Sequence, residues 1–286
     1  MVNASAVTVR LLVASSVAIM LNVTSLAAQA TLGTAKSFAV LGGSTVTNTG
    51  TTTLGGDLGV WSGSSITGEN SGGNKILYTG TVHKGDGVAH QAQDDARSAY
   101  NALAGLPSKA NLSGTDLGAL GSPLTPGVYR FSTSAFLTGA LVLDFMGNSA
   151  SSFVFQIGST LITASNSSVS VVNPGASGTN TSIFWQVGSS ATLGTNTSFM
   201  GTIIADQSIT LTTGANIVCG RAIALVGAVT LDGNNILNQC ANGGTADFPP
   251  TVVPEPSTVS LLASAGGLVL FAAMRRGRRR RFAAGL

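Results

Sequence analysis

The 286-residue sequence predicts an all-β domain, a three-sided parallel β-solenoid with one long α-helix packed alongside it. Three observations support this prediction. Short segments recur at a step of about 18 residues, each repeat divides into short alternating apolar stretches separated by Gly, Asn or Ser, and one stretch has helical periodicity instead. A repeat of this length is typical of one solenoid coil, which buries its apolar side only when another coil stacks on it.

The repeats are clearest in the C-terminal third. Thr192–Thr195 (TLGT) recurs one step later as Thr210–Thr213 (TLTT), and Met200–Ala205 (MGTIIA) recurs as Cys219–Ala224 (CGRAIA). The segment STVTNTG, which begins at Ser44, aligns with SGSSITG, which begins at Ser62. Glycines are expected at the corners between strands, where a positive φ is readily adopted, at Gly55, Gly56, Gly194, Gly214 and Gly233.

One segment departs from the solenoid pattern. Between Asp86 and Pro107 apolar residues recur at helical spacing, which predicts a helix over about residues 87–105. Asp86 is the expected N-cap, and Gly105 with Pro107 ends the helix. We expect its alanine-rich side to pack along the solenoid and its charged residues to face water, namely Asp94, Asp95 and Arg97.

The N-terminus has the features of a secretory signal peptide. Arg10 precedes an apolar run from Leu11 to Leu21, and the small residues Ala28-Gln29-Ala30 predict cleavage before Thr31. Residues 1–30 are therefore expected to be removed on export. An uncleaved signal-anchor helix is the alternative.

The C-terminus carries a three-part tail. A linker at 249–258 contains the motif Pro254-Glu255-Pro256, an uncharged apolar stretch at 259–274 is interpreted as a transmembrane segment, and residues 275–286 hold six arginines that mark the cytoplasmic side. This order resembles the PEP-CTERM sorting tail of Gram-negative bacteria. The resemblance implies transient anchoring in the inner membrane, processing by a membrane protease, an exosortase, and delivery to the cell surface or outside the cell. A plain C-terminal membrane anchor is the alternative.

The charge and cysteine content of the domain at 31–248 narrow its function. Without the signal peptide and the tail, the domain holds seven basic and ten acidic residues, although the whole chain has a net charge of +3. It therefore lacks the basic surface that nucleic-acid binding requires. Cys219 and Cys240 in an exported chain predict one disulfide, with two isolated buried thiols as the alternative.

The residue pattern offers little for catalysis. Acidic residues are scattered, and the adjacent pair Asp94 and Asp95 lies on the predicted helix, whereas glycoside hydrolysis needs paired carboxylates across a site. The two histidines, His83 and His90, are too few for a zinc site and are expected at the surface. No nucleophile elbow or phosphate-binding loop occurs. We therefore expect no enzyme, no bound metal and no cofactor.

Six segments, taken in order, resemble one protein family. They are LGTAKSFAVLGGSTVTNTG, AQDDARSAYNALAGLP, LTPGVYRFSTSAFLTGALVLD, FVFQIGSTLITASNSSV, FWQVGSSATLGTNTSFMGTIIADQSITLTTGAN and GRAIALVGAVTLDGNNI. Over Thr31 to about Ile236 the chain is similar to the ice-binding (antifreeze) proteins of the DUF3494 type. The resemblance implies a discontinuous right-handed β-helix of triangular section with a helix alongside. It also implies that one flat face adsorbs to ice and inhibits ice growth or recrystallisation, with the ice crystal as partner.

Threonine suits such a face for physical reasons. Stacked coils place equivalent side chains about 4.8 Å apart, and threonine combines a stiff χ1, a methyl group that orders water and a hydroxyl that joins the ordered layer. Family members often carry T-A/G-x-T/N there, and the pattern occurs at 49–52, 67–70, 163–166 and 213–216. The resulting ice-binding candidates are Thr49, Thr52, Thr67, Thr163, Thr192, Thr195, Thr210, Thr213, Asn216 and Thr230.

Two questions stay open at the level of sequence. Alternation along ITLTTGAN favours Thr210 and Thr212, whereas the family pattern favours Thr213 and Asn216, and Glu69 places a charge inside one match. The alternative function is a structural or adhesive protein of the cell surface or exopolysaccharide matrix, in which threonine and glycine only serve strands and corners. The two functions differ in whether the Thr, Ser, Asn and Gly columns form one unbroken, flat, uncharged face.

Overall fold

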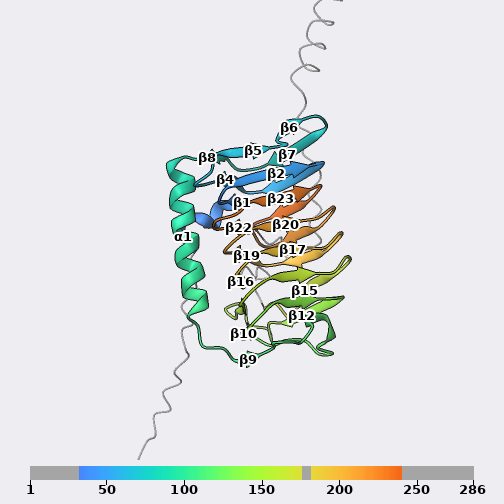
Figure 1. The fold of residues 1–286 in the computed structure, drawn as a ribbon. Helices are drawn as coiled ribbons and strands as arrows, with labels where there is room; N and C mark the ends of the chain where they lie inside the picture. Colours follow the sequence, from blue (N-terminus) through green and yellow to red (C-terminus); the bar gives the residue numbers. More distant parts are fainter. Residues whose placement is uncertain (1–31, 176–181, 240–286) are drawn as a thin grey trace, which may run out of the picture. The chain divides into compact units, whose positions relative to one another are not determined.

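Three sheets form the sides of a parallel β-solenoid in a computed structural model that describes residues 32–175 and 182–239 (Figure 1). Sheet A has the strand order β8 (Val82–Lys84), β4 (Asp57–Val60), β1 (Phe38–Gly42), β22 (Ala222–Ala224), β19 (Thr202–Ala205), β16 (Ile183–Val187), β13 (Phe153–Ile157), β10 (Gly127–Phe131) and β9 (Ala110–Asn111). Sheet B has the order β11 (Ala135–Leu137), β14 (Leu161–Thr163), β17 (Ala191–Leu193), β20 (Ile209–Leu211), β23 (Val229–Asp232), β2 (Thr45–Thr49) and β5 (Ser65–Thr67). Sheet C has the order β12 (Ala140–Asp144), β15 (Ser168–Val172), β18 (Ser198–Met200), β21 (Asn216–Val218), β24 (Asn235–Leu237), β3 (Thr51–Gly55), β7 (Asn74–Tyr78) and β6 (Asn70–Ser71). The predicted solenoid is confirmed.

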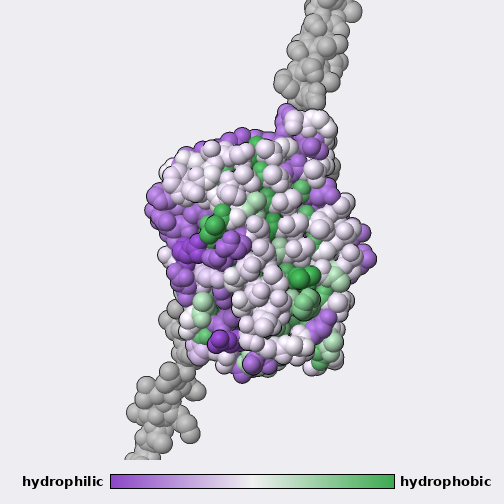
Figure 2. Space-filling model, viewed as in Figure 1, coloured by the Kyte–Doolittle hydropathy of each residue, from purple (hydrophilic) through white to green (hydrophobic). Residues whose placement is uncertain are grey.

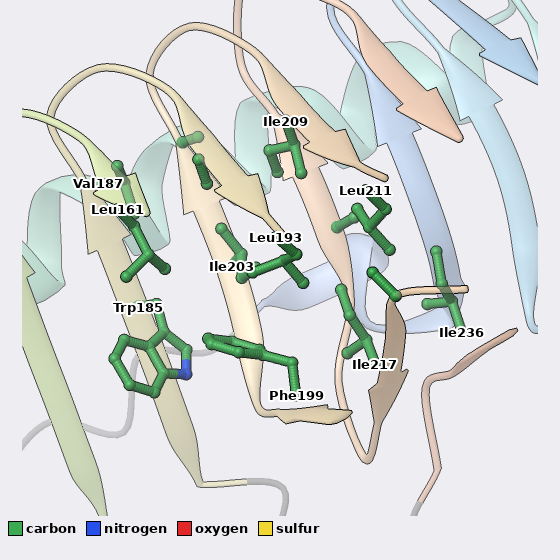
Figure 3. Packing of buried hydrophobic residues seen from close by; sticks show 14 of the residues in the cluster. Leu161, Trp185, Val187, Leu193, Phe199, Ile203, Ile209, Leu211, Ile217 and Ile236 are labelled. Atoms are coloured by element: carbon green, nitrogen blue, oxygen red, sulfur yellow. The ribbon is translucent and has the colours of Figure 1, made fainter. Parts of the chain in front are cut away.

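The core fills the triangle between the sheets. Inward side chains of successive coils stack on one another, and the ring centroids of Phe155 and Trp185 lie 3.9 Å apart. Phe199 of sheet C packs against Trp185 of sheet A, as Figure 3 shows. The centroids of the two rings lie 4.8 Å apart. The indole Nε1 of Trp185 donates a hydrogen bond to the carbonyl oxygen of Met200 at 3.0 Å. The apolar alternation of the sequence is thus converted into one continuous core.

The corners between sheets B and C need a left-handed residue in each coil. Gly214 has φ +69°, and Asn196 takes the equivalent place one coil away with φ +58°. The expectation of positive φ is confirmed at Gly56, Gly214 and Gly233 but is wrong at Gly55 and Gly194. Gly194 is needed for space instead, because a Cβ there would lie 2.6 Å from the backbone carbonyl oxygen of Thr163.

The helix predicted at about 87–105 is α1 (Gly87–Ala104), and it lies along the outer side of sheet A (Figure 1). The Asp86 carboxylate caps it by accepting a hydrogen bond from Ala89 N at 2.9 Å. Small side chains let the helix approach the sheet closely, and its buried stripe consists of Ala89, Ala92, Ala96, Ala99 and Leu103, packed against Leu41, Ile204 and Ile223.

Two of the three charged helix residues are partly exposed and also fasten the helix to the solenoid. Asp95 accepts hydrogen bonds from the backbone N and the hydroxyl of Thr34, both at 2.7 Å, and these bonds lower the pKa of its carboxyl. Thr34 belongs to the 3-10 helix η1 (Gly33–Ser37). Arg97 donates to Asp206 at 2.7 Å and lowers the pKa of that carboxyl. Asp94 is exposed, as predicted.

The coils do not follow chain order along the stack. The chain lays down β1 to β8, crosses along α1 to the opposite end, and then builds coils back until β22, β23 and β24 meet β1, β2 and β3. In Figure 1 the blue strand β2 lies beside the orange strand β23. We refer to this junction of β1–β3 with β22–β24 as the seam. It joins residues far apart in sequence, so it is the non-local contact that makes the solenoid discontinuous.

Hydrogen bonds that involve side chains cross the seam at two places. Arg221 is buried and donates from Nε and Nη2 to the carbonyl oxygen of Lys36 at 2.9 and 2.6 Å. Burial lowers the pKa of Arg221 to about 10. Near the corner of sheets B and C, Asn234 N donates to the buried hydroxyl of Thr52 at 3.1 Å. These bonds anchor the N-terminal coils to the end of the C-terminal stack.

Gln93 of α1 links both sides of the seam. Its Nε2 donates to the carbonyl oxygen of Gly42 at 3.1 Å and to that of Ala224 at 3.0 Å. We expect Gln93→Met to lower the free energy of unfolding by about 1 kcal/mol. The substitution removes both hydrogen bonds, but it also removes an amide oxygen that is buried without a hydrogen-bond partner among the described residues, so the net loss is small. Urea unfolding measures this change. Exposed Gln91→Met is the control, and an equal loss in both variants would contradict a seam role for Gln93.

Cys219 is disulfide-bonded, in agreement with the predicted oxidised state. Its predicted partner, Cys240, lies outside the described residues, as do the predicted signal peptide, the Pro254-Glu255-Pro256 motif and the predicted transmembrane segment at 259–274. Among residues 32–175 and 182–239, no helix has both the length and the apolar character needed to span a bilayer.

Candidate functional site

One row of outward side chains crosses all seven strands of sheet B. Backbone register places the members side by side in the order Phe136, Ile162, Thr192, Thr210, Thr230, Thr47 and Thr67. We name these residues the central row. At about 4.8 Å between strands, its five consecutive threonines span about 19 Å. The neighbours of the members from Phe136 to Thr47 are buried, and Ile66 beside Thr67 packs partly against the core, which holds the row on a regular sheet rather than on loops.

A second row of small side chains runs beside the central row, at the start of each strand of sheet B. Its members are Ser134, Thr160, Ser190, Ser208, Ala228, Thr45 and Ser65. The hydroxyls of Ser134 and Thr160 lie 2.7 Å apart, and the Ser190 hydroxyl accepts from Ser208 N at 3.3 Å. No member is charged, so two parallel rows of uncharged side chains cover the sheet.

A third row, the corner row, lies where sheet B turns toward sheet C. It consists of Ser165, Thr195, Thr213, Asp232 and Thr49, which successive coils join by backbone hydrogen bonds of 2.8 to 3.1 Å. The Asp232 carboxylate accepts hydrogen bonds from the hydroxyls of Thr49 and Thr213 at 2.9 and 2.5 Å. The corner row therefore differs from the other two rows in holding a charge.

The three sheets differ in how many charged residues their strands contain. Among the described strands, sheet B contains one charged residue, Asp232, at the end of β23 where the chain turns toward sheet C. Sheet A contains Asp57, Lys84 and Arg130, and sheet C contains Lys75 and Asp144. Figure 2 shows strongly hydrophilic colour gathered over α1, while the side that carries β2, β23, β20 and β17 is mostly pale. Sheet B is thus the least charged side of the solenoid.

The predicted candidates separate into four groups. Thr67, Thr192, Thr210 and Thr230 belong to the central row, and Thr49, Thr195 and Thr213 belong to the corner row. Asn216 lies on sheet C, where its amide donates to Gly214 O at 3.0 Å.

Thr52 and Thr163 are buried, with exposed fractions of 0% and 3%, so their selection as surface residues is wrong. The Thr52 hydroxyl donates to Asn48 Oδ1 at 2.7 Å, and the Thr163 hydroxyl lies 2.9 Å from that of Thr197. Both hydroxyls satisfy buried polar groups under the corner of sheets B and C.

Sequence reasoning missed Thr47, Ile162 and Phe136. The alternation in STVTNTG places Thr45, Thr47 and Thr49 on one side of a strand and could have found Thr47. Ile162 and Phe136 carry no polar signal, and only strand register identifies them as members of the central row.

The titratable groups near the start of α1 make local contacts. His83 Nδ1 lies 2.8 Å from Asp86, and hydrogen bonds from Ala89 N and then from His83 lower the pKa of the Asp86 carboxyl. His90 is exposed, lies 3.4 Å from Asp94 and packs against the Trp61 ring. Within the described part of the chain, no three His, Cys, Asp or Glu residues are grouped as a metal site would require.

Comparison with known proteins places the chain in a family. The family model described as ice-binding-like matches residues 40–237. The chain belongs to the ice-binding-like family. It is 53% identical over 249 residues to an ice-binding protein of Nostoc sp. (strain HG1), covering 87% of this chain and 88% of that protein. It is also 32% identical over 232 residues to ice-binding protein 1 of Shewanella frigidimarina, covering 72% of this chain and 25% of that protein.

Solved structures of ice-binding proteins share the fold. One, from an Antarctic biological consortium, has a TM-score of 0.67 and 42% identity and covers 73% of this chain and 90% of its own. Another, from the Antarctic ascomycete Antarctomyces psychrotrophicus, has a TM-score of 0.64 and 38% identity. That match covers 74% of this chain and 98% of the other chain. The resemblance to the DUF3494-type ice-binding family is therefore confirmed, and membership in it agrees with the expectation that the chain is not an enzyme.

Proposed function

We propose that this protein binds ice through sheet B and thereby inhibits ice growth or recrystallisation. The observation that carries the proposal is the run of five threonines in the central row, Thr192, Thr210, Thr230, Thr47 and Thr67, on adjacent strands without a charge between them. Ice-binding relatives support the same function.

Adsorption to a crystal depends on a regular spacing of the groups that bind it. A sheet repeats its side chains at a fixed strand spacing, and a crystal surface repeats its water molecules, so a planar array of like groups makes many equivalent weak contacts at once. Stiff χ1 angles reduce the entropy lost on adsorption, since threonine has little rotamer freedom to lose. Methyl groups and hydroxyls alternate over such a surface, which lets it order water without holding a tightly bound hydration shell.

The alternative, a matrix or adhesive protein without ice activity, predicts no single uncharged face. Sheet B supports ice binding over this alternative because the central row and its neighbouring row are uncharged over all seven strands. Ile162 and Phe136 continue the central row as apolar side chains, so the regular hydroxyl pattern covers five coils.

Thermal hysteresis and ice recrystallisation of the purified protein test the proposal. We expect a measurable hysteresis gap, faceted crystals and enrichment of fluorescently labelled protein in slowly grown ice. A folded protein that is excluded from ice and leaves crystal growth unchanged would lead us to abandon ice binding for the matrix-protein alternative.

We further propose that the protein acts outside the cytoplasm. Residues 1–30 direct export, the segment at 259–274 anchors the chain briefly in the inner membrane, and an exosortase-type protease cleaves near Pro254-Glu255-Pro256. The disulfide at Cys219 supports an oxidising compartment. Mass spectrometry of the protein recovered from the cell surface tests this route, and a mass that includes the arginine-rich residues 275–286 would exclude processing.

A further inference from the structure

The central row is split between two parts of the chain. Thr47 and Thr67 come from the N-terminal coils, whereas Thr192, Thr210 and Thr230 come from the C-terminal stack, and the two groups meet at the seam. The hydroxyls of Thr47 and Thr230 lie 3.3 Å apart across the seam, although these residues are 183 positions apart in sequence. An error in seam register would therefore disturb the row at its centre.

Asp232 is placed to fix this register. It directly faces Thr49 across the seam and is the charged residue of the described strands of sheet B. One carboxylate oxygen accepts from the Thr49 hydroxyl on the N-terminal side, and the other accepts from the Thr213 hydroxyl on the C-terminal side. The Thr49 hydroxyl also lies 3.3 Å from the carbonyl oxygen of Leu231.

Hydrogen bonds fix the backbone of Asp232 at both its N–H and its carbonyl group. The backbone N of Asp232 donates to the side-chain oxygen of Asn234 at 2.6 Å, and the carbonyl oxygen of Asp232 accepts from Gly214 N at 3.1 Å. Asn234 is itself buried and bonded to two carbonyl oxygens, those of Thr212 and Ala215. The carboxylate therefore extends from a rigid backbone, and its bonds to two hydroxyls are stronger than neutral hydrogen bonds.

We propose that Asp232 is a positioning residue that aligns the two parts of the threonine face across the seam. The inference rests on the proposed ice-binding function of sheet B. Both carboxylate oxygens accept hydrogen bonds from protein hydroxyls, so fewer of their acceptor sites bind water. The charge therefore disturbs the surface water less than a free carboxylate would. In this role Asp232 fixes χ1 of Thr49 and Thr213 and, through them, the register of the coils that carry β20, β23 and β2.

Substitutions at Asp232 separate bridging from charge. Asp232→Ala removes both acceptors, whereas Asp232→Asn keeps a bridge because its amide oxygen accepts from one hydroxyl and its NH2 donates to the other. We expect thermal hysteresis to fall by roughly twofold or more in Asp232→Ala and to stay close to the wild-type value in Asp232→Asn.

The matched control is Asp144→Ala on sheet C. Asp144 also accepts two hydrogen bonds, from Met146 N at 2.8 Å and from Asn173 Nδ2 at 2.9 Å, but it lies away from sheet B. This variant should lose stability to urea like Asp232→Ala and keep its hysteresis. Circular dichroism near 0 °C establishes that each variant is folded before hysteresis is compared.

The outcomes separate the two proposals. A wild-type protein without hysteresis overturns the proposed function. An active wild type with an equally active Asp232→Ala overturns only the positioning role, and so does an Asp232→Asn variant as impaired as Asp232→Ala, since charge rather than bridging would then be required.

Discussion

Replacement of Thr210 by tyrosine is expected to abolish most of the ice-binding activity. Thr210 lies in the middle of the central row, with Thr192 on one neighbouring strand and Thr230 on the other. A tyrosine ring extends well beyond the plane of the threonine side chains, so it keeps the flat face away from a flat crystal on both sides. We expect thermal hysteresis to fall by roughly tenfold or more, the fold-change that about 1.4 kcal/mol of lost adsorption free energy produces.

Two further variants show whether the effect belongs to this row. Thr53→Tyr introduces the same ring at an exposed threonine of β3 on sheet C and should leave hysteresis unchanged. Thr213→Tyr introduces it in the corner row, where the hydroxyl already donates to Asp232, and should have a smaller effect than Thr210→Tyr. Equal losses at Thr210 and Thr53 would argue against sheet B as the ice-binding face. Near-UV circular dichroism of each variant controls for folding.

The local sequence pattern predicted the individual strands, corners and helix because each of them is determined by residues that are close together in the sequence. The repeat step from Thr192 to Thr210 becomes an actual strand pair with that register, and the alanine spacing of residues 87–105 becomes α1. In each case a short segment contains both the apolar residues and the corner or cap that define the element.

The seam could not be predicted in this way. β2 pairs with β23 because the N-terminal coils dock on the last coil of the stack, and no repeat step relates Thr47 to Thr230. The position of Thr47 in the row therefore depends on a contact between the two ends of the domain. For the same reason, Asp232 has no visible partner in the sequence.

Burial of Thr163 shows why the family pattern selected the wrong side of a strand. In β14 the polar residue Thr163 points inward and the apolar residue Ile162 points outward, the reverse of the usual alternation. The inward hydroxyl is stable there because it accepts from Gly194 N at 2.9 Å and lies beside the hydroxyl of Thr197. A motif that counts residue types does not record these buried partners.

Replacement of Trp185 by alanine is expected to be among the most destabilising single changes in the domain. Trp185 is fully buried between Phe155 and Phe199, and removing its side chain leaves a cavity along the axis of the solenoid. The free energy of unfolding should fall by about 3–5 kcal/mol, and the carbonyl oxygen of Met200 loses the indole donor as well. Urea unfolding followed by circular dichroism measures the loss.

Trp185→Phe is expected to cost less than Trp185→Ala. Phenylalanine keeps one ring in the stack but removes both the donor to Met200 and the second ring of the indole, so we expect a loss of about 1–2 kcal/mol. Tyr78→Ala, at a residue with 41% of its surface exposed, should change stability by less than about 0.5 kcal/mol. Trp185 lies on sheet A and does not touch water, so either Trp185 variant that remains folded near 0 °C should keep its thermal hysteresis. Loss of hysteresis in a folded Trp185→Phe variant would mean that the threonine face depends on core packing as well as on the seam.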